Sequence, residues 1–448
     1  MRCEYLKPLG RSINRRSLLA HAGAVLVAAG LDRRIASAAD ATPQRVQRGS
    51  PVELRCWLMG HEAEFLAQML PEFERRNPGI TVTIQQVPWT AAHEKLLTAF
   101  AGDALPDVCN LGNTWVPEFT TLNALEPLDA YIASSTVVQP LDYFPGIWET
   151  IRMDGAVSAI PWYVDTRLLY YRRDLLAQAG YDHPPTTWSE WARMFAAIKT
   201  HVGTDRYAVL FPINEFEPLL ALALQQSEPL LRDDGRRGAF ESDGFRRTLA
   251  FYVETFRQGW APMMSNTQVS NVWAEFGRGM FSFYISGPWS IEEFQRRLPP
   301  ELADAWMTAP LPGPNGPGAS IAGGSSFVIF RASPHKAAVW RLIEYLSEPE
   351  VQIHFHDLTG NLPPRRSAWL DPRLTGNAYA RAFHDQLERV KPTPQVPEWE
   401  HIANEMQALA EQVVHDQFSI EAGTRELDRR VDAILEKRRW MLDHRRTA

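Results

Sequence analysis

The chain has 448 residues, of which 45% are hydrophobic and 11% aromatic, so it can bury the cores of about two or three ordinary domains and is not a disordered chain. Residues 39–448, which remain if an N-terminal export signal is removed, hold 39 Lys and Arg against 51 Asp and Glu, a net charge of −12. This acidic balance argues against a nucleic-acid-binding protein.

Residues 1–38 have the organisation of an export signal. Arg11, Arg15 and Arg16 precede an apolar run over residues 18–31, and Ala36-Ser37-Ala38 is a small-residue cleavage site. The segment 14–19 resembles a twin-arginine motif, so the twin-arginine route, a plain secretory signal and an uncleaved anchor all stay open. The apolar run is short for a membrane span, which favours cleavage and a soluble protein in the periplasm.

Cleavage would leave Cys56 and Cys109, which are too few for a disulfide framework. Both fall in predicted strands, so we expect buried free thiols, with one bridge in an oxidising compartment as the alternative.

The segment 52–111 alternates strand and helix patterns. Strands are predicted over residues 52–58, 80–87 and 106–111, and helices over 64–76 and 91–101. This order predicts a parallel α/β unit, in which ligands bind at the carboxyl ends of the strands. The sequence therefore points to the loops at 59–62 and 112–115.

The middle of the chain begins with a Leu- and Tyr-rich segment over 166–172, followed by a short helix that Gly180 ends. Thr187 is predicted to cap the next helix, with Glu190 completing a capping box. Later predicted elements are strands over 207–211 and 280–285 and helices over 243–259 and 273–279. The strand at 280–285 leads into Gly287-Pro288-Trp289, which places an aromatic ring at its end.

A strand over 324–330 follows a Pro/Gly-rich segment at 309–318. Its leading glycines indicate a close approach to the backbone, and the Pro/Gly segment is predicted to cross between two bodies as a second hinge. Beyond it we expect helices over 334–346, 399–416 and 419–440, and a polar loop over 358–366.

The sequence lacks the common catalytic motifs: a Gly-x-Ser-x-Gly elbow, a Walker loop, a Gly-x-Gly-x-x-Gly turn and a His-Glu-x-x-His helix. His354 and His356 would diverge on a helix and make a poor metal site. We therefore expect no enzyme, no cofactor and no metal, although paired carboxylates for glycoside hydrolysis are set in space and stay open.

Polar and aromatic side chains gather at the predicted strand ends and helix starts. Carboxylates, amides and Arg can hydrogen-bond pairs of hydroxyls, and aromatic rings cover the C–H faces of a sugar. Each residue alone could pack, cap or lie at the surface, but together they predict a polyol or sugar site. The candidates are Glu62, Asn113, Trp115, Tyr163, Asp165, Glu215, Phe216, Trp289, Arg365 and Trp399.

Several short motifs follow one another between residues 71 and 363. They include Pro71-Glu72-Phe73-Glu74, Leu105-Pro106-Asp107-Val108, Tyr170-Tyr171-Arg172-Arg173-Asp174-Leu175-Leu176, Gly287-Pro288-Trp289, Gly323-Gly324-Ser325-Ser326 and Thr359-Gly360-Asn361-Leu362-Pro363. In this order they resemble the extracellular solute-binding proteins of ABC sugar importers, of the maltose- and trehalose-binding group (family 1). The resemblance covers essentially all of residues 39–448, although Arg172 stands where Asn is usual.

The resemblance implies a two-lobed periplasmic-binding-protein fold, type II-like, in which each α/β lobe has a mostly parallel sheet flanked by helices. Hinge segments join the lobes, and one solute is clamped between them. The implied N-terminal lobe holds residues 39–162 and 323–362, and the C-terminal lobe holds residues 163–322 and 363–448.

The resemblance also implies roles for the candidate residues. Trp289 would be the stacking aromatic, Trp399 would lie near another, and Tyr163 and Asp165 would bind hydroxyls at the first hinge. Gly324 and Ser325 would offer backbone groups at the second hinge, and Arg365 matches an Arg of trehalose- and maltose-binding relatives. Glu62 and Asn113 would lie in first-lobe loops, and Glu215 and Phe216 in a second-lobe loop.

The implied function is capture of a sugar, with disaccharides such as maltose or trehalose favoured, and its delivery by a monomer to the permease subunits of an ABC transporter. Two other functions stay open: an exported carbohydrate-active enzyme, and a ligand sensor without a transport role on the same scaffold.

Overall fold

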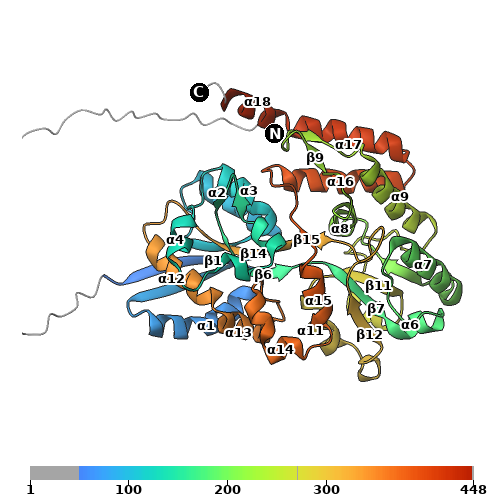
Figure 1. The fold of residues 1–448 in the computed structure, drawn as a ribbon, viewed down its shortest axis with the longest axis horizontal. Helices are drawn as coiled ribbons and strands as arrows, with labels where there is room; N and C mark the ends of the chain where they lie inside the picture. Colours follow the sequence, from blue (N-terminus) through green and yellow to red (C-terminus); the bar gives the residue numbers. More distant parts are fainter. Residues whose placement is uncertain (1–49, 270, 446–448) are drawn as a thin grey trace, which may run out of the picture. The chain divides into compact units, whose positions relative to one another are not determined.

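The computed structural model describes residues 50–269 and 271–445, so the expected export signal at 1–38 lies outside the described residues. Within the part of the chain that is described, no helix has the length and apolar character needed to cross a membrane. Two separate sheets, each covered by helices, organise this part of the chain (Figure 1).

The first sheet has five strands in the order β2-β1-β3-β14-β6. Its strands are β1 (Val52–Met59), β2 (Ile80–Val87), β3 (Val108–Gly112), β14 (Gly323–Ile329) and β6 (Ile160–Asp165). The pairings of β1 with β2 and β3 are parallel, as the sequence predicts. Helices α1 (Glu62–Arg76) and α2 (Trp89–Ala101) supply the two crossovers, because parallel neighbours need a long connection.

The second sheet has the order β12-β7-β11-β8, with β7 (Leu168–Arg172), β8 (Tyr207–Leu210), β11 (Phe281–Ser286) and β12 (Trp306–Ala309). The pairing of β11 with β8 is parallel, and β7 pairs antiparallel with β11 and β12. In the first sheet, β14 likewise runs antiparallel to β3 and β6. Each sheet therefore has one reversed strand, β14 in the first and β7 in the second, while its other strands run in the same direction, so both sheets are mostly parallel as expected. A strand that enters from the other lobe runs against its neighbours.

The chain passes from the first sheet to the second between β6 and β7, and returns between β13 (Ser320–Ile321) and β14. The Pro/Gly-rich segment is not itself the crossing, contrary to the sequence-based prediction. The Gly313 carbonyl accepts a 2.8 Å bond from the first amide of α7 (Trp188–Val202), and the Gly318 carbonyl accepts from Gln386 in α15 (Ala380–Leu387). These contacts attach the segment to helices beside the second sheet.

The glycines that begin β14 allow its backbone to approach β6. A Cβ added to Gly323 would lie 2.2 Å from the Asp165 carbonyl oxygen, and one added to Gly324 would lie 2.2 Å from the Tyr163 carbonyl oxygen. Gly324 also has φ +138°, which other residues rarely adopt. The sequence predicts a close approach to this backbone, and the group that approaches it is the backbone of the neighbouring strand β6.

Cys56 and Cys109 are free and buried. Cys56 lies opposite Val108 in the ladder between β1 and β3, and Trp57 lies opposite Cys109. Because side chains alternate between the faces of a sheet, the two thiols point to opposite faces. A bridge between them would require a change of register.

Helix α7 begins where the sequence predicts. The Thr187 hydroxyl accepts a 3.2 Å bond from the Glu190 amide, which is the expected cap. The Glu190 carboxylate, however, accepts from the Thr186 amide at 2.7 Å, so the reciprocal bond of a capping box goes to the preceding residue.

Long helices complete the second lobe. Helices α9 (Asp243–Arg257), α16 (Trp399–Val414) and α17 (Ile420–Ile434) pack on one another. The helix predicted over 419–440 is two helices, because α17 ends at Ile434 and α18 spans Glu436–Arg445. The sequence-based prediction also missed α13 (Pro349–Thr359), which occupies the start of the expected polar loop.

The other described helices are α3 (Val116–Thr121), α4 (Asp129–Ser134), α5 (Pro145–Glu149), α6 (Arg173–Gln178), α8 (Glu217–Ala223), α10 (Val272–Gly277), α11 (Trp289–Arg297), α12 (Lys336–Ser347) and α14 (Pro372–Thr375). Short 3₁₀ turns are η1 (Asn113–Trp115), η2 (Pro140–Asp142), η3 (Pro300–Leu302) and η4 (Arg366–Leu370), and short strands are β4 (Arg152–Met153), β5 (Ala156–Val157), β9 (Leu231–Arg232), β10 (Arg237–Gly238) and β15 (Val390–Lys391).

One apolar cluster surrounds the first sheet and two flank the second, so each sheet has its own core.

Candidate functional site

A cavity of about 1050 Å³ lies where loops from both sheets and the crossing segments meet. The first sheet contributes the loop after β1, the turn η1 after β3 and the end of α13. The second lobe contributes the starts of α8, α11 and α16, while β6, its following turn and β14 line the centre. Strand ends and helix starts therefore surround the cavity, as expected for α/β sheets.

Glu62 stands at the first-sheet wall, at the start of α1. A Cβ at Gly60 would lie 2.3 Å from a Glu62 carboxylate oxygen, so the absence of a side chain there lets the carboxylate lie against the backbone. The Asn361 amide donates to the other Glu62 oxygen at 3.4 Å. The pKa of Glu62 is raised above its ordinary value, because burial outweighs hydrogen bonds that include those from Tyr163 and Asn361.

Asn113 and Asp165 each carry a buried polar atom that makes no hydrogen bond. Asn113 is only 4% exposed, and its Oδ1 accepts a 2.7 Å bond from the Ser326 hydroxyl. Its Nδ2 is buried without a hydrogen-bond partner among the described residues. Oδ1 of Asp165 also accepts no hydrogen bond there, although Nε of Arg167 lies 3.4 Å from it as an ion pair. Both side chains line the cavity. The cavity thus has one donor without a partner and one acceptor held only by an ion pair, a combination to which hydroxyl groups can hydrogen-bond.

Aromatic rings line both walls of the cavity. On the first-sheet side, the rings of Trp89 and Trp115 meet edge to face with centroids 5.5 Å apart. On the other side are Phe216, Trp273 and Trp289. Such rings present flat apolar faces that suit the C–H faces of a sugar.

The Trp289 ring lies directly over the backbone of Gly287. A Cβ added there would be 2.0 Å from Cζ3 of the ring, which is far inside contact distance. Tyr170 donates a 2.7 Å bond to the Gly287 carbonyl and so fixes the same turn. Because Gly287 has no side chain, the Trp289 ring of the Gly-Pro-Trp motif can lie against the Gly287 backbone.

Charged groups in the cavity are mostly paired. Arg167 lies 3.4 Å from Asp165 and 3.2 Å from Glu217, and Arg296 and Arg297 both pair with Glu293. This arrangement leaves a cavity with more carboxylates than cations.

Glu400, at the start of α16, reaches the first-sheet side. Its carboxylate accepts a hydrogen bond from the Thr114 hydroxyl in η1. Burial raises the pKa of Glu400, and the bond from Thr114 opposes that rise. This contact joins the two walls of the cavity directly.

Most of the candidates from the sequence meet in this cavity. Its lining includes Glu62, Asn113, Trp115, Tyr163, Asp165, Phe216, Trp289 and Gly324. Glu215, Ser325, Arg365 and Trp399 are absent from the lining.

Trp399 and Ser325 belong to the interior of the protein. Trp399 is 0% exposed and packs in the core beside the second sheet. The Ser325 hydroxyl accepts from the Asn110 amide at 2.9 Å and donates to the Leu111 carbonyl at 3.2 Å, so it is used within the first sheet. The Trp399 ring expected near the site is therefore a core group, and the Ser325 side chain is engaged within the sheet, whereas the role expected of Ser325 concerns its backbone.

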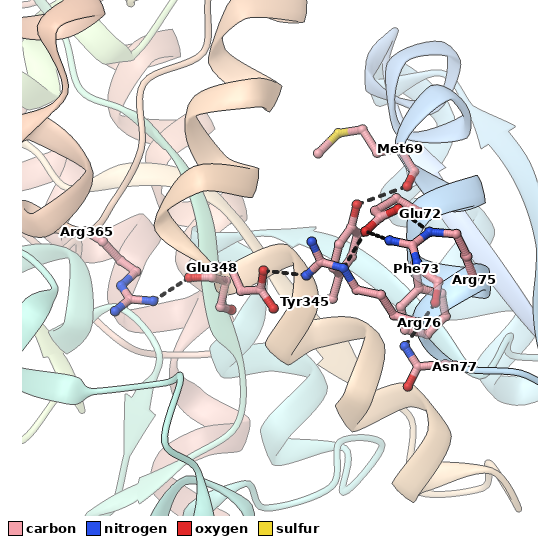
Figure 2. Close-up of polar contacts among 10 residues, drawn as sticks. Met69, Glu72, Phe73, Arg75, Arg76, Asn77, Tyr345, Glu348 and Arg365 are labelled. Carbon is pink, nitrogen blue, oxygen red and sulfur yellow. Dashed lines mark hydrogen bonds and ion pairs between the residues drawn. The ribbon is translucent and has the colours of Figure 1, made fainter.

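Arg365 is a structural residue in the described fold. Its Nε donates a 2.6 Å bond to Asp142, and its Nη1 donates to the Ser347 carbonyl at the end of α12. Figure 2 shows Arg365 directed at this helix end, beside Glu348, whose carboxylate pairs with Arg76 of α1 at 2.9 Å. The guanidinium expected at the ligand is thus held away from the cavity.

Glu215 lies just before α8. Its carboxylate accepts a 3.0 Å bond from the Asn266 amide, and burial raises its pKa. The cavity is lined instead by Phe216 and Glu217, the next residues along the chain.

Sequence reasoning missed Trp89, Arg167, Glu217, Trp273 and Glu400, all of which line the cavity. Trp89 follows β2 directly, so the rule that ligands lie at the carboxyl ends of strands could have found it. Glu217 and Glu400 each stand within two residues of a named candidate. Arg167 likewise stands two residues from the candidate Asp165, whereas nothing in the local pattern singles out Trp273.

The described residues contain no group of three or more His, Cys, Asp or Glu side chains placed to hold a metal ion. His356 Nδ1 donates a 3.1 Å hydrogen bond to the Asn361 carbonyl, and burial lowers the pKa of His356.

Known proteins provide an independent comparison. The sequence profile of the bacterial extracellular solute-binding proteins matches residues 60–353. The solved structure of the sugar-binding protein MalE from Xanthomonas citri is 57% identical, covers 88% of this chain and 99% of its own, and gives a TM-score of 0.85. Maltose-bound MalE3 from T. maritima is 25% identical, covering 86% of this chain and 100% of its own, with a TM-score of 0.73. A putative binding protein of Brucella abortus is 24% identical over 380 residues, 83% of this chain and 90% of its own. The profile match begins in the loop after β1 and ends within α13, so it holds most of the cavity lining.

Proposed function

The chain belongs to the family of bacterial extracellular solute-binding proteins, and from this premise we propose that it captures an uncharged saccharide for an ABC importer. Maltose and trehalose are the first candidates. The similarity to the sugar-binding MalE of X. citri supports a sugar, as does the similarity to the maltose-bound protein of T. maritima.

One observation carries the proposal: in one cavity, the Asn113 amide donor has no partner and the Asp165 Oδ1 acceptor has only its ion pair with Arg167. A buried polar group without a partner costs about 1–3 kcal/mol. A sugar hydroxyl can accept from the amide, and another can donate to the carboxylate. Binding would then remove the penalty at Asn113 and give Asp165 a hydrogen bond, whereas an anionic ligand would meet the carboxylates of Asp165 and Glu217.

The aromatic walls support the same ligand class. Trp289 on α11 and Trp115 on η1 line opposite sides of the cavity, so one saccharide could stack on both. Stacking on an aromatic ring favours a ligand with apolar C–H faces and polar edges.

The mechanism proposed is binding followed by closure. The expected lobes are residues 39–162 with 323–362 and residues 163–322 with 363–448, but the whole of β6 belongs to the first sheet, so we propose that the first boundary lies after Asp165 and not after residue 162. The chain crosses at 166–167 and at Ala322, and these short segments would act as the hinges. A ligand that contacts both walls favours the closed state by its differential affinity, and no bond is made or broken.

In this proposal the signal at 1–38 directs export to the periplasm, and the closed monomer docks on the permease subunits of the transporter. The carboxylates and aromatic rings of the cavity serve binding, and the protein is not an enzyme. Incubating the protein with candidate sugars and analysing the products separates this role from that of an exported carbohydrate-active enzyme, which would release products.

Thermal unfolding of the purified protein against a ligand panel tests the proposal. A ligand that binds only the folded state adds roughly 4 kcal/mol of stability at about a thousandfold excess over its Kd. We expect a clear rise in Tm with a neutral disaccharide and none with glycerol phosphate or a polyamine. A rise with charged ligands alone would reject the saccharide.

A further inference from the structure

Arg167 occupies the short turn between β6 and β7, at the first crossing between the sheets. Its guanidinium lies 3.4 Å from Asp165 at the end of β6 and 3.2 Å from Glu217 at the start of α8. The Arg167 carbonyl also accepts a 2.6 Å bond from the Ser320 hydroxyl, which lies just before the second crossing. One residue therefore ties together both crossings and the second-lobe wall of the cavity.

The same guanidinium lies over the ring of Trp289, with its carbon 4.8 Å from the ring centroid. The ring is thus fixed by two contacts, the Gly287 backbone and the Arg167 guanidinium. A planar guanidinium suits this place because it can stack on a ring while its edge donates to carboxylates, which an ammonium group cannot do.

Acidic groups of the protein itself also surround the Arg167 guanidinium. Its side chain is 17% exposed, and the groups that face it are Asp165 on β6, Glu215 and Glu217 beside α8, and Tyr284 on β11. Burial alone would lower the pKa of Arg167, but these neighbours outweigh it and raise the pKa. The charge of Arg167 is therefore committed to carboxylates that the protein itself supplies.

We propose that Arg167 is a positioning residue that holds the Trp289 ring and the Asp165 and Glu217 carboxylates in place for a saccharide, and that its pairing makes the site select uncharged over anionic sugars. The inference rests on the proposed function, because it concerns the same cavity. It assigns Arg167 no direct bond to the ligand.

The binding test uses trehalose, maltose and trehalose 6-phosphate as probes in calorimetric titrations. The variants are Arg167→Ala and Arg167→Lys, with Arg193→Ala on the exposed face of α7 as the control. We expect Arg167→Ala to weaken the neutral disaccharide by about tenfold or more, as loss of a buried cation–π contact and of two ion pairs implies. The affinity of Arg167→Lys should lie between those of Arg167→Ala and the wild type, and the affinity of Arg193→Ala should equal that of the wild type.

A pH series separates positioning from general damage. Burial raises the pKa of Asp165, and Arg167 opposes that rise. Removing Arg167 therefore raises the pKa of Asp165 further, so on acidification the affinity of Arg167→Ala should begin to fall at a higher pH than that of the wild type. A loss that is equal at every pH would overturn the proposal.

A ligand-free measurement keeps the inference distinct from the proposed function. Arg167→Ala should change the tryptophan emission of the ligand-free protein, and the change should vanish when Trp289→Phe is already present. If the wild type binds none of the sugars, the proposed function fails while this comparison still reports the contact. If the wild type binds trehalose 6-phosphate more tightly than trehalose, and Arg167→Ala abolishes that preference, Arg167 is a direct anion-binding group and the inference is wrong.

Discussion

Replacing Arg365 by Ala should damage the fold and spare the ligand site. The sequence places this residue at the ligand, but in the structure it joins η4 to α12 and to the turn η2 through Ser347 and Asp142. Its side chain is only 7% exposed, and its guanidinium lies 5.8 Å from the centroid of the Tyr143 ring. The variant therefore separates a structural role from a binding role.

The size of the effect follows from the bonds that are lost. Hydrogen bonds to charged groups contribute about 1.5–3 kcal/mol each, and breaking a buried pair costs about 3–5 kcal/mol. Asp142 keeps a 2.9 Å bond from the Ser367 amide and a second from its hydroxyl, which limits the penalty on the remaining carboxylate. We expect Arg365→Ala to lower the free energy of unfolding by about 3 kcal/mol.

Arg366→Ala is the matched control. Arg366 pairs with Glu388 at 2.6 Å, but both side chains are well exposed, at 40% and 42%. An exposed pair of this kind contributes about 0.5 kcal/mol or less.

Guanidinium unfolding followed by tryptophan fluorescence measures the stability of both variants, and titration with the best disaccharide measures their affinity. Because Arg365 does not line the cavity, its removal should leave the affinity of the folded protein nearly unchanged. An Arg365→Ala variant with wild-type stability and a strongly reduced affinity would refute this reasoning and restore Arg365 to the ligand site.

Three further variants test other parts of the structure. Gly287→Ala should displace the Trp289 ring and weaken sugar binding by about 1–3 kcal/mol, as titration would show; an unchanged affinity would mean that the ring is not a binding surface. Burial raises the pKa of Glu62 in the folded state. Glu62→Gln should therefore stabilise the ligand-free protein at pH 7. The gain should vanish as the pH falls below about 4, because the carboxyl is then protonated in both the folded and the unfolded state. Exposed Glu64→Gln should show no such gain in the same denaturation series. Thr187→Ala should lose about 1 kcal/mol of stability by removing the cap of α7, while sugar affinity measured by titration stays unchanged.

The first α/β unit could be predicted from the sequence because its information is local. The sequence signals lie within a few residues for strands β1 and β2 and for the helices that follow them. The same is true of the Thr187 cap of α7. The direction of β14 could not be predicted in this way. Its antiparallel pairing with β3 and β6 depends on which lobe the chain comes from, and that is decided by contacts more than a hundred residues away.

The residues of the candidate site likewise divide into those with a local sequence signal and those without one. Trp289 was found because a ring after a strand and a Gly-Pro turn is a local signal. Trp399 was expected in the site, yet its neighbour Glu400 faces the cavity. One residue along a helix rotates a side chain by about 100°, so an offset of one exchanges a core position for a ligand position. The role of Arg167 could not be predicted because, apart from Asp165, its partners Glu217 and Trp289 are remote in sequence.

A crystal structure of the protein grown with trehalose or maltose tests the central claim most directly. The account predicts a disaccharide in the cavity, with one hydroxyl accepting from Asn113 Nδ2, another donating to Asp165 Oδ1, and a sugar ring against the Trp289 indole. A saccharide bound elsewhere, or one that makes no hydrogen bond to Asn113 Nδ2 or Asp165 Oδ1, would contradict it.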